Sequence, residues 1–144
     1  MKNFVIAGIG TEIGKTLVSA ILTEALEADY WKPIQAGSLS NTDTDTIRNF
    51  TTNKKSVLHK EGFVLKKAVS PHAAAKAEKI KIKLSDLILP KTKNTLLIEL
   101  AGGLMVPFNE KDLNIDLLKK WKLPVEESKQ VAGQKTGSRP FRSP

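Results

Sequence analysis

A glycine-rich loop between an expected strand and an expected helix constrains this chain more than any other feature. Residues 3–7 form a short apolar run, typical of a buried parallel strand. The loop GIGTEIGKT follows at residues 8–16 and leads into residues 16–28, whose apolar positions recur at helical spacing. Backbone N–H groups in such a loop, together with the helix N-terminus, can hold phosphate oxygens. The sequence therefore predicts a nucleotide site at its first strand–loop–helix unit.

Two side chains at the end of this loop carry the expected chemistry. Lys15 would bring a positive charge to the outer phosphates, and the Thr16 hydroxyl would be one ligand of a magnesium ion that bridges them. The spacing departs from the usual pattern, because five residues separate Gly8 from Gly14 and Ile9 stands where the first glycine usually lies. The alternative is a glycine turn before a helix that happens to begin Lys-Thr. The order of strand, loop and helix favours nucleotide binding.

Strand and helix patterns alternate along the rest of the chain. Strands are expected over 30–34 and 95–100. Helices are expected after an N-cap at Asp43 or Thr44, from Pro71 after an N-cap at Ser70, and over 112–121. Pro33 cannot donate a ladder hydrogen bond, so the first of these strands must end or bulge there. The alternation predicts an α/β fold of the phosphate-loop NTPase type, with a doubly wound parallel sheet and flanking helices.

Composition indicates the domain limits and the compartment. One nucleotide-binding domain is expected over residues 1–125, because 144 residues with 40% apolar content suffice for a single core. Residues 126–144 hold scattered apolar residues among many breakers, so we expect a disordered tail and a fold that is incomplete at its C-terminal side. The absence of cysteine excludes disulfides and thiolate metal sites and favours a reducing compartment, the cytoplasm.

Hydropathy and charge argue against two kinds of partner. No segment approaches the roughly 18–20 apolar residues that cross a bilayer, so no membrane partner is expected. The formal net charge is +8, with eleven lysines between Lys54 and Lys93. Arginine and aromatic residues, on which guanine readout and base stacking depend, are almost absent there. The pattern favours a solvated lysine-rich face over a nucleic-acid site.

Two acidic residues are candidates for the oxygen ligands that a magnesium–phosphate site needs. Glu99 lies near the end of an apolar strand, where a carboxylate is costly unless it is paired or bound to a metal. Parallel strands gather their carboxyl ends at one edge, which puts Glu99 on the same side as the glycine loop. Asp45 follows the second strand, and on chemistry alone it could nearly as well be a helix cap or a solvated turn residue.

Lys32 and the two histidines carry weaker signals. If Lys32 is buried, it needs a phosphate, carboxylate or carbamate partner; otherwise it is an exposed cation at a strand end, and the residues alone favour neither. His72 stands at a helix start, where a lone histidine is more often structural. His59 lies in a lysine-rich loop and indicates no function.

Four segments, taken together, resemble dethiobiotin synthetase: GIGTEIGKT, YWKPIQAGS, SPHAAA and ELAGGLMVPF, in this order and between about Asn3 and Val125. That family is similar in fold to other phosphate-loop ATPases. The resemblance implies an ATP- and magnesium-dependent ligase of biotin biosynthesis that joins CO2 to 7,8-diaminononanoate and forms the ureido ring of dethiobiotin, releasing ADP and phosphate. It implies a phosphorylated carbamate, which the second amine attacks, and a homodimer.

The resemblance also implies residue roles. Lys32 would be the catalytic lysine beside the carbamate, and with Lys15 it would offset charge on the transferred phosphoryl group. Magnesium would be served by Thr16, Asp45 and Glu99. The nucleotide would be contacted by Glu12, Ile13, Gly14, Lys15, Thr16, Leu17, Asp45, Glu99, Leu100, Ala101 and Gly102.

Several positions concern the substrate or depart from the family pattern. Thr11 would be a loop residue on the substrate side, as would Ala36, where many relatives have a serine or threonine hydroxyl. Gly10 replaces an acidic residue of some members. Leu100 interrupts what is usually Glu-Gly-Ala-Gly-Gly, at a place where backbone has to approach the nucleotide or metal closely.

Three functional hypotheses remain. The first is the dethiobiotin-synthetase-type ligase. The second is a ParA/MinD-like switch ATPase, in which the nucleotide state governs partner or membrane binding; that class usually has an extra lysine early in its phosphate loop, where this chain has Ile9 and Gly10. The third is a catalytically inactive, truncated remnant.

Overall fold

The computed structural model describes residues 2–10 and 12–123. The elements, in chain order, are β1 (Asn3–Gly8), α1 (Lys15–Ala25), β2 (Asp29–Trp31), β3 (Ile34–Ala36), α2 (Asp43–Phe50), β4 (Leu58–His59), β5 (Phe63–Leu65), α3 (Pro71–Ala77), the 3-10 turn η1 (Leu84–Asp86), β6 (Leu96–Gly103) and α4 (Asn114–Trp121). The expected tail over residues 126–144 lies outside the described residues.

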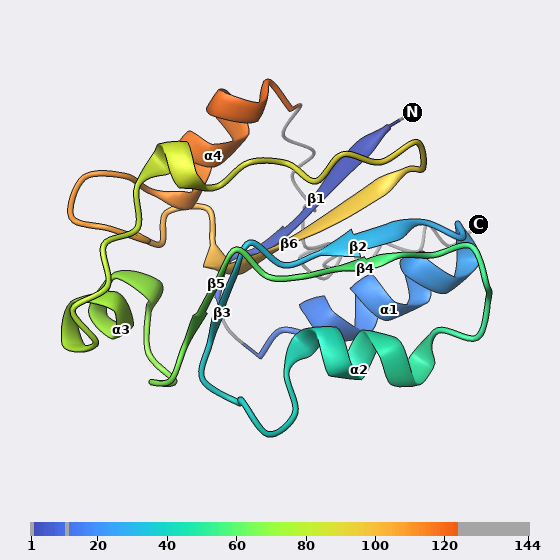
Figure 1. The fold of residues 1–144 in the computed structure, drawn as a ribbon, viewed down its shortest axis with the longest axis horizontal. Helices are drawn as coiled ribbons and strands as arrows, with labels where there is room; N and C mark the ends of the chain where they lie inside the picture. The colour runs from blue at the N-terminus through green and yellow to red at the C-terminus, as the bar shows by residue number, and fades with distance from the viewer. Residues whose placement is uncertain (1, 11, 124–144) are drawn as a thin grey trace, which may run out of the picture.

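The strands form two parallel sheets. A four-stranded sheet has the order β1-β6-β2-β4, and β3 and β5 make a second, two-stranded sheet. In the larger sheet Ile6 pairs with Glu99, and Trp31 pairs with Ile98. Helices α1 and α2 lie on one face of this sheet and α4 lies on the other (Figure 1). The predicted α/β fold, a parallel sheet with flanking helices, is confirmed.

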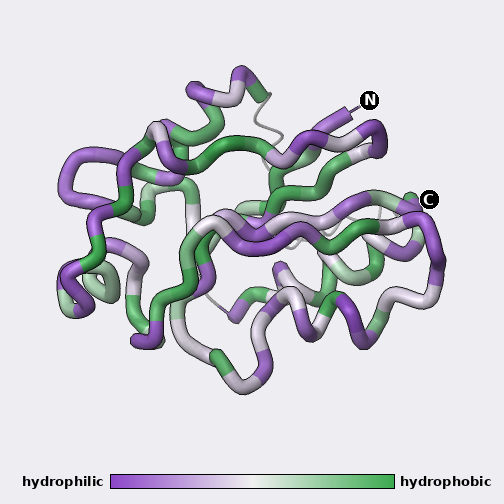
Figure 2. Tube along the Cα trace, in the orientation of Figure 1, coloured by the Kyte–Doolittle hydropathy of each residue, from purple (hydrophilic) through white to green (hydrophobic). Residues whose placement is uncertain are grey.

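The two faces of the sheet bury different cores. The larger core fills the face covered by α4 and α3, and it includes Ile98, Leu100 and Phe108. Trp31 and Trp121 meet within it at 5.6 Å between ring centroids. The face under α1 and α2 has a much smaller buried cluster. Figure 2 shows hydrophobic stretches along β1 and β6, which are neighbouring strands of the larger sheet.

Proline and capping residues set several boundaries. Strand β2 ends at Trp31, and β3 begins at Ile34 in the other sheet, so the chain leaves the larger sheet at Pro33 as expected. Helix α3 begins at Pro71, with Ser70 as its N-cap, also as expected. The cap expected at Asp43 or Thr44 was wrong by one or two residues. Thr42 caps α2, since its hydroxyl accepts a hydrogen bond from the Asp45 N–H.

Across residues 2–10 and 12–123, no helix is long and apolar enough to cross a membrane.

Candidate nucleotide-binding site

A cavity of about 740 Å³ opens at the carboxyl ends of the parallel strands, beside the start of α1. Crevices at this edge of open α/β sheets are where ligands bind. Its lining comes from five parts of the chain: Glu12, Gly14, Lys15, Thr16, Lys32, Gln35, Ala36, Ser38, Asp43, Ala68, Val69, Ser70, Pro71, Glu99, Ala101, Gly102 and Val106. The glycine loop, β3, the start of α2, the start of α3 and the end of β6 therefore meet at one place.

The glycine loop enters α1 through a backbone conformation that needs glycine. Gly14 is the N-cap residue and has φ of 86°, the left-handed region that side chains disfavour. Because Gly14 has no side chain to cap the helix, the first N–H groups of α1 stay available to an anion. Lys15 folds back over the loop, and its Nζ donates to the Gly10 carbonyl oxygen at 2.9 Å. Burial lowers the pKa of Lys15, although Glu99 opposes this effect.

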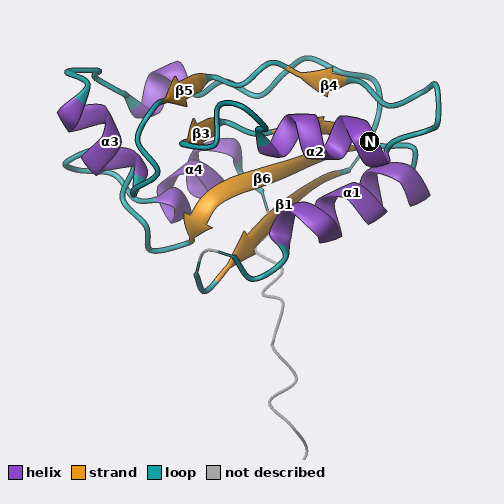
Figure 3. Ribbon diagram, turned by 90° about the horizontal axis from the view of Figure 1, so that it is seen from below, coloured by secondary structure: helices purple, strands orange, loops and turns teal. Residues whose placement is uncertain are grey.

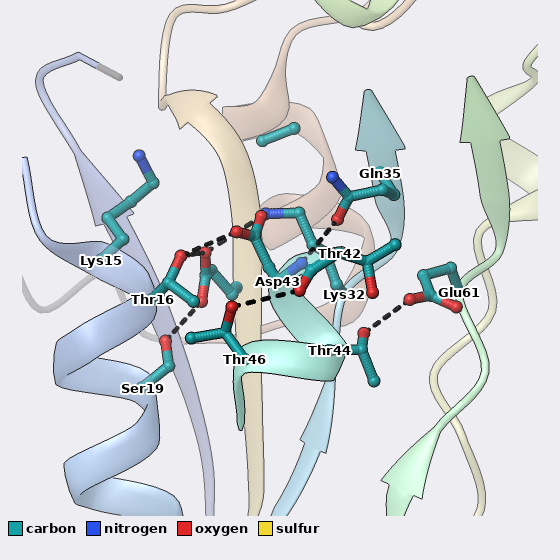
Figure 4. A network of polar contacts seen from close by, with 12 residues as sticks. Lys15, Thr16, Ser19, Lys32, Gln35, Thr42, Asp43, Thr44, Thr46 and Glu61 are labelled. Atoms are coloured by element: carbon teal, nitrogen blue, oxygen red, sulfur yellow. Dashed lines mark hydrogen bonds and ion pairs between the residues drawn. The ribbon is translucent and has the colours of Figure 1, made fainter. Parts of the chain in front are cut away.

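Glu99 is the centre of the polar network in the cavity floor. Figure 4 labels three of its partners, Thr16, Ser19 and Lys32. Its side chain is fully buried, and its two oxygens have different partners. Oε2 accepts hydrogen bonds from Ser19 Oγ at 2.6 Å and Tyr30 Oη at 3.1 Å, both from buried residues. Oε1 accepts from Thr16 Oγ1 at 3.0 Å and Lys32 Nζ at 3.2 Å. One oxygen is thus held by the core, and the other faces the cavity residues.

Lys32 lies between two carboxylates. Its Nζ pairs with Asp43 and with Glu99, and only 4% of the residue is exposed. The alternative of an exposed cation at a strand end is therefore wrong. A buried ammonium needs such partners, because leaving it unpaired costs several kcal/mol, on the order of the penalty for any buried ion.

Asp43, which the sequence did not single out as an acidic ligand, occupies the place predicted for Asp45. Asp43 Oδ1 accepts from Thr16 Oγ1 at 3.0 Å, and its other oxygen pairs with Lys32. Asp45 instead closes the capping box of α2: it accepts from the Thr42 N–H at 3.0 Å and pairs with Arg48 outside the cavity. Hydrogen bonds from Thr42, and then Arg48, hold the pKa of Asp45 below its ordinary value.

The spacing of the cap could have identified Asp43. In a capping box the N-cap threonine and the acid three positions later bond each other, which commits Thr42 and Asp45 to the helix end. Asp43, at the first helical position, is then the acid left to face the cavity. Gln35 supports that position, since its Oε1 accepts from the Asp43 N–H at 3.3 Å while its Nε2 donates to the Gly37 oxygen at 2.9 Å.

Alternation along β6 divides the other predicted nucleotide contacts. Glu99, Ala101 and Gly102 line the cavity, but Leu100 is 1% exposed and belongs to the larger core on the opposite face. Its side chain is therefore not brought to the nucleotide position. Gly102 has φ of 77°, and an added Cβ would lie 2.9 Å from a Val106 side-chain atom, so glycine is required there.

The remaining loop and substrate residues are split in the same way. Glu12 and Ala36 line the cavity, whereas Ile13 and Leu17 do not, and both of those side chains are about half exposed. Thr11 lies outside the described residues. Ser38 follows Ala36 closely on the cavity wall and brings a hydroxyl to the side where Ala36 has none.

The histidines contact structural groups. His72 Nδ1 lies 3.1 Å from Ser70 Oγ, beside the cap of α3. His59 Nε2 lies 3.1 Å from Asp29 Oδ2, at the amino-end edge of the sheet. Neither residue lines the cavity.

The donor set of the cavity fits magnesium in chemistry. Thr16, Asp43 and Glu99 offer a hydroxyl and two carboxylates, which are the hard oxygen ligands that magnesium prefers. In nucleotide enzymes magnesium is usually held by one or two carboxylates together with phosphate oxygens and water.

Comparisons with known proteins identify the family of the chain. A family model described as an AAA domain matches residues 2–125. A curated protein from Christiangramia forsetii, named ATP-dependent dethiobiotin synthetase BioD, is 48% identical over 132 residues, which are 92% of this chain and 64% of that protein. Its namesake from Cytophaga hutchinsonii is 54% identical over 119 residues, 82% of this chain and 57% of that protein.

The match covers only part of the relatives' length, but these relatives all have the same name. A further protein of the same name, from Chlamydia pneumoniae, is 42% identical over 84% of this chain and 54% of its own length. The chain thus spans between about half and two thirds of the curated relatives it matches. The resemblance to dethiobiotin synthetase predicted from the four segments is confirmed.

Proposed function

The chain belongs to the AAA-domain family whose model matches residues 2–125, and from that premise we propose that it carries the ATP-binding and phosphoryl-transfer centre of a dethiobiotin-synthetase-type ligase. The observation that carries the proposal is the meeting of Lys32, Asp43 and Glu99 with the Thr16 hydroxyl at one cavity. A lysine held between two carboxylates, beside a glycine loop, suits phosphoryl transfer from ATP to a second anion, because its positive charge can offset the negative charge that develops during the transfer.

The glycine loop would bind the phosphates of ATP. The N–H groups at the start of α1 can donate hydrogen bonds to an anion, and the helix dipole favours negative charge there. Lys15 would exchange the Gly10 oxygen for a phosphate oxygen, a stronger, charge-assisted partner. Thr16, Asp43 and Glu99 would hold magnesium, which when bound would neutralise charge on the outer phosphates. Asp45 is not proposed as a ligand, because its oxygens are engaged at the cap.

Lys32 would act on the second anion. In the proposed reaction one amine of 7,8-diaminononanoate adds to CO2 and loses a proton to give a carbamate. A carbamate oxygen then takes the terminal phosphoryl group of ATP, leaving ADP. The second amine attacks the carbonyl carbon, phosphate departs, and the loss of the amine proton closes the ureido ring. Lys32, buried beside Glu99 and Asp43, would hold the carbamate in line with the phosphoryl group.

A turnover assay tests the proposal. The protein is incubated with ATP, magnesium, bicarbonate and 7,8-diaminononanoate, and dethiobiotin is measured by mass spectrometry. ATP consumption that ignores the diamine would support a ParA/MinD-like switch ATPase instead. The same assay is repeated on a fusion of residues 1–123 to the part of the Cytophaga hutchinsonii relative that this chain does not match.

Lys32→Ala gives the sharper readout in whichever form turns over. We expect it to leave ATP binding nearly intact and to abolish diamine-dependent turnover, because its partner is the carbamate and the phosphoryl group in transfer. Lys60→Ala, an exposed lysine that does not line the cavity, is the matched control. Unchanged turnover in Lys32→Ala would remove its catalytic role. The proposal includes a cytoplasmic homodimer that acts on small molecules.

A further inference from the structure

A second cavity lies beside α3. Its volume is about 640 Å³, and it is lined by parts of residues 72–84, which run from α3 to η1, and by residues 108–112. No described residue lines both this α3–η1 cavity and the nucleotide cavity beside α1. Figures 1 and 3 show α3 at the margin of the fold away from α1 and α2. The α3–η1 cavity is therefore a separate site.

The floor of the α3–η1 cavity is apolar. Ala75 and Ile82 are each 4% exposed and belong to the larger core, and Ile80 and Leu84 are partly buried and pack against that core. Phe108, from the other segment of the lining, belongs to the same core. Binding sites for small molecules are mostly of this kind, with apolar walls and a few polar groups that fix orientation. The floor therefore suits a hydrocarbon chain.

The rim of the α3–η1 cavity is rich in lysine. Residues 79–83 read Lys-Ile-Lys-Ile-Lys and belong to neither sheet. Their three lysines are exposed, whereas Ile80 is partly buried and Ile82 is buried, so the segment turns apolar side chains to the core and charges to solvent. Lys76 and Lys111 bring the exposed lysines of the lining to five. The lysine-rich face expected from the sequence is thus gathered, in part, around a cavity.

Two acidic residues of the lining offset only part of this charge. Asp112 is engaged locally, because its Oδ2 accepts from Asn109 Nδ2 at 2.8 Å. Glu110 lies 3.9 Å from Lys76, and both side chains are about four-fifths exposed, so that this ion pair is weak. Five lysines and two carboxylates leave the lining with a formal excess of three positive charges. Such an excess raises the local concentration of anions.

We propose that the α3–η1 cavity binds an aliphatic monocarboxylate, with the hydrocarbon chain on the apolar floor and the carboxylate among the rim lysines. A small inorganic anion would leave the floor uncovered, and an aliphatic amine would bring a second positive charge to the lysines. Two sources share the required chemistry. One is a free fatty acid, and the other is the ureido product of the proposed reaction, which keeps the chain and carboxylate of 7,8-diaminononanoate without its charged amines.

Calorimetry on the 144-residue chain tests the inference. Sodium octanoate and dethiobiotin are the probes; sodium acetate, which lacks the chain, and octyltrimethylammonium, which replaces the carboxylate by a cation, are the controls. We expect one-to-one binding of a probe with a dissociation constant of about 1 mM or tighter at low salt, and no measurable binding of either control. The probe that binds more tightly identifies the source. Failure of both probes, or equal binding of octyltrimethylammonium, would overturn the inference.

A matched pair of charge reversals shows whether the rim lysines are responsible. Lys81→Glu with Lys83→Glu should weaken probe binding by tenfold or more, and both side chains are exposed, so the fold should tolerate the change. Lys91→Glu with Lys93→Glu is the control, because it alters net charge equally at two exposed lysines that do not line the cavity. Equal losses in the two proteins would mean that net charge alone attracts the probe, and the inference would fail.

Amide chemical shifts of the isotope-labelled chain locate each probe. We expect changes at residues 72–84 and 108–112 and none at the glycine loop. Changes confined to residues 12–16 would place the probe in the nucleotide cavity and would overturn the inference. ATP affinity, measured separately on the same chain, reports only on the proposed function. The α3–η1 cavity shares no described lining residue with the nucleotide cavity, so either proposal can fail while the other holds.

Discussion

Glu99 and Asp29 are both buried carboxylates of the larger sheet, but they lie toward opposite ends of its strands. Glu99 is fully buried and accepts from Thr16, Ser19, Tyr30 and Lys32. Asp29 is 2% exposed and has a similar number of partners, among them the Val57 N–H, Thr92, Asn94 and His59. Burial and hydrogen bonding alone would therefore not separate a candidate site from a structural junction.

Two differences do separate them. Glu99 has a lysine partner and lines the cavity at the carboxyl ends of the strands, which is the edge where α/β sheets bind ligands. Asp29 begins β2, at the other edge, and its partners come from the segments that flank the neighbouring strands β4 and β6. Glu99 therefore faces the cavity, whereas Asp29 connects β2 with the segments that flank β4 and β6. The following predictions test that distinction.

The largest effect is expected for Glu99→Ala. It would remove one of the two carboxylates of Lys32 and leave the hydroxyls of Ser19 and Tyr30 without their acceptor. Breaking a buried ion pair in this way costs about 3–5 kcal/mol of unfolding free energy. Urea denaturation followed by circular dichroism measures it. Glu27→Ala, which breaks the exposed pair with Lys55, is the control and should cost less than about 1 kcal/mol. Equal stability of the two variants would mean that the buried cluster does not form.

A smaller effect, with a different pH dependence, is expected for Asp29→Asn. Burial raises the pKa of Asp29, but hydrogen bonds from Thr92, Val57 and His59 outweigh it and lower that pKa below the ordinary value. A lowered folded-state pKa adds stability above the unfolded pKa of about 4, and this stability is lost as the pH falls through the folded value.

Asp29→Asn should therefore cost about 2 kcal/mol at pH 7, and its difference from the unmodified protein should shrink below about pH 4. Urea midpoints measured from pH 7 to pH 3 test this. ATP affinity should stay within about twofold, because Asp29 lies away from the cavity. A strong loss of ATP binding in a folded Asp29→Asn protein would contradict the distinction between the two carboxylates.

The boundaries of strands and helices could be predicted from the sequence where one or two neighbouring residues determine them. The Pro33 break and the Ser70-Pro71 helix start are fixed by one or two residues each, and the structure agrees with both. Strands β4 and β5 have two and three residues and no periodic pattern, so only their pairing with distant strands defines them. They were not predicted.

The site divides in the same way. Glu99 was identified because a carboxylate in an apolar strand is costly unless it is paired, and the structure supplies those pairs. The choice between Asp43 and Asp45 required the capping box, which assigns one acid to the helix end and the other to the cavity. Leu100 looked like a steric obstacle, but strand alternation turns its side chain into the core.

Lys15→Ala should separate ligand binding from stability. We expect ATP affinity to fall about tenfold, because the loop loses its point charge while its N–H groups remain. Unfolding free energy should change by less than about 0.5 kcal/mol, since the lysine makes one hydrogen bond, to the Gly10 oxygen, at a partly exposed position. Isothermal calorimetry and urea denaturation measure the two quantities, with Lys91→Ala as an exposed control. Equal nucleotide affinities would remove the phosphate-loop assignment.

The smallest effect, and the finest test of the comparison, is expected for Tyr30→Phe. The ring stays packed with Ala20 and Ile47, so the change removes only the hydroxyl that donates to Glu99 Oε2. Burial, with Glu99 close by, raises the pKa of Tyr30 far above its usual range, so the hydroxyl remains a donor at every working pH. Ser19 still holds the same oxygen, so we expect a loss of about 1 kcal/mol in unfolding free energy.

The double variant Ser19→Ala with Tyr30→Phe then reports on the shared oxygen. If both hydroxyls hold Glu99 Oε2, removing the second costs more than removing the first, by about 0.5 kcal/mol or more in a double-mutant cycle. The magnesium dependence of ATP affinity should weaken in parallel, because an unheld Glu99 no longer keeps Oε1 beside Thr16 and Lys32. Additive losses with unchanged magnesium dependence would show that the two hydroxyls pack the core without orienting Glu99 toward the cavity.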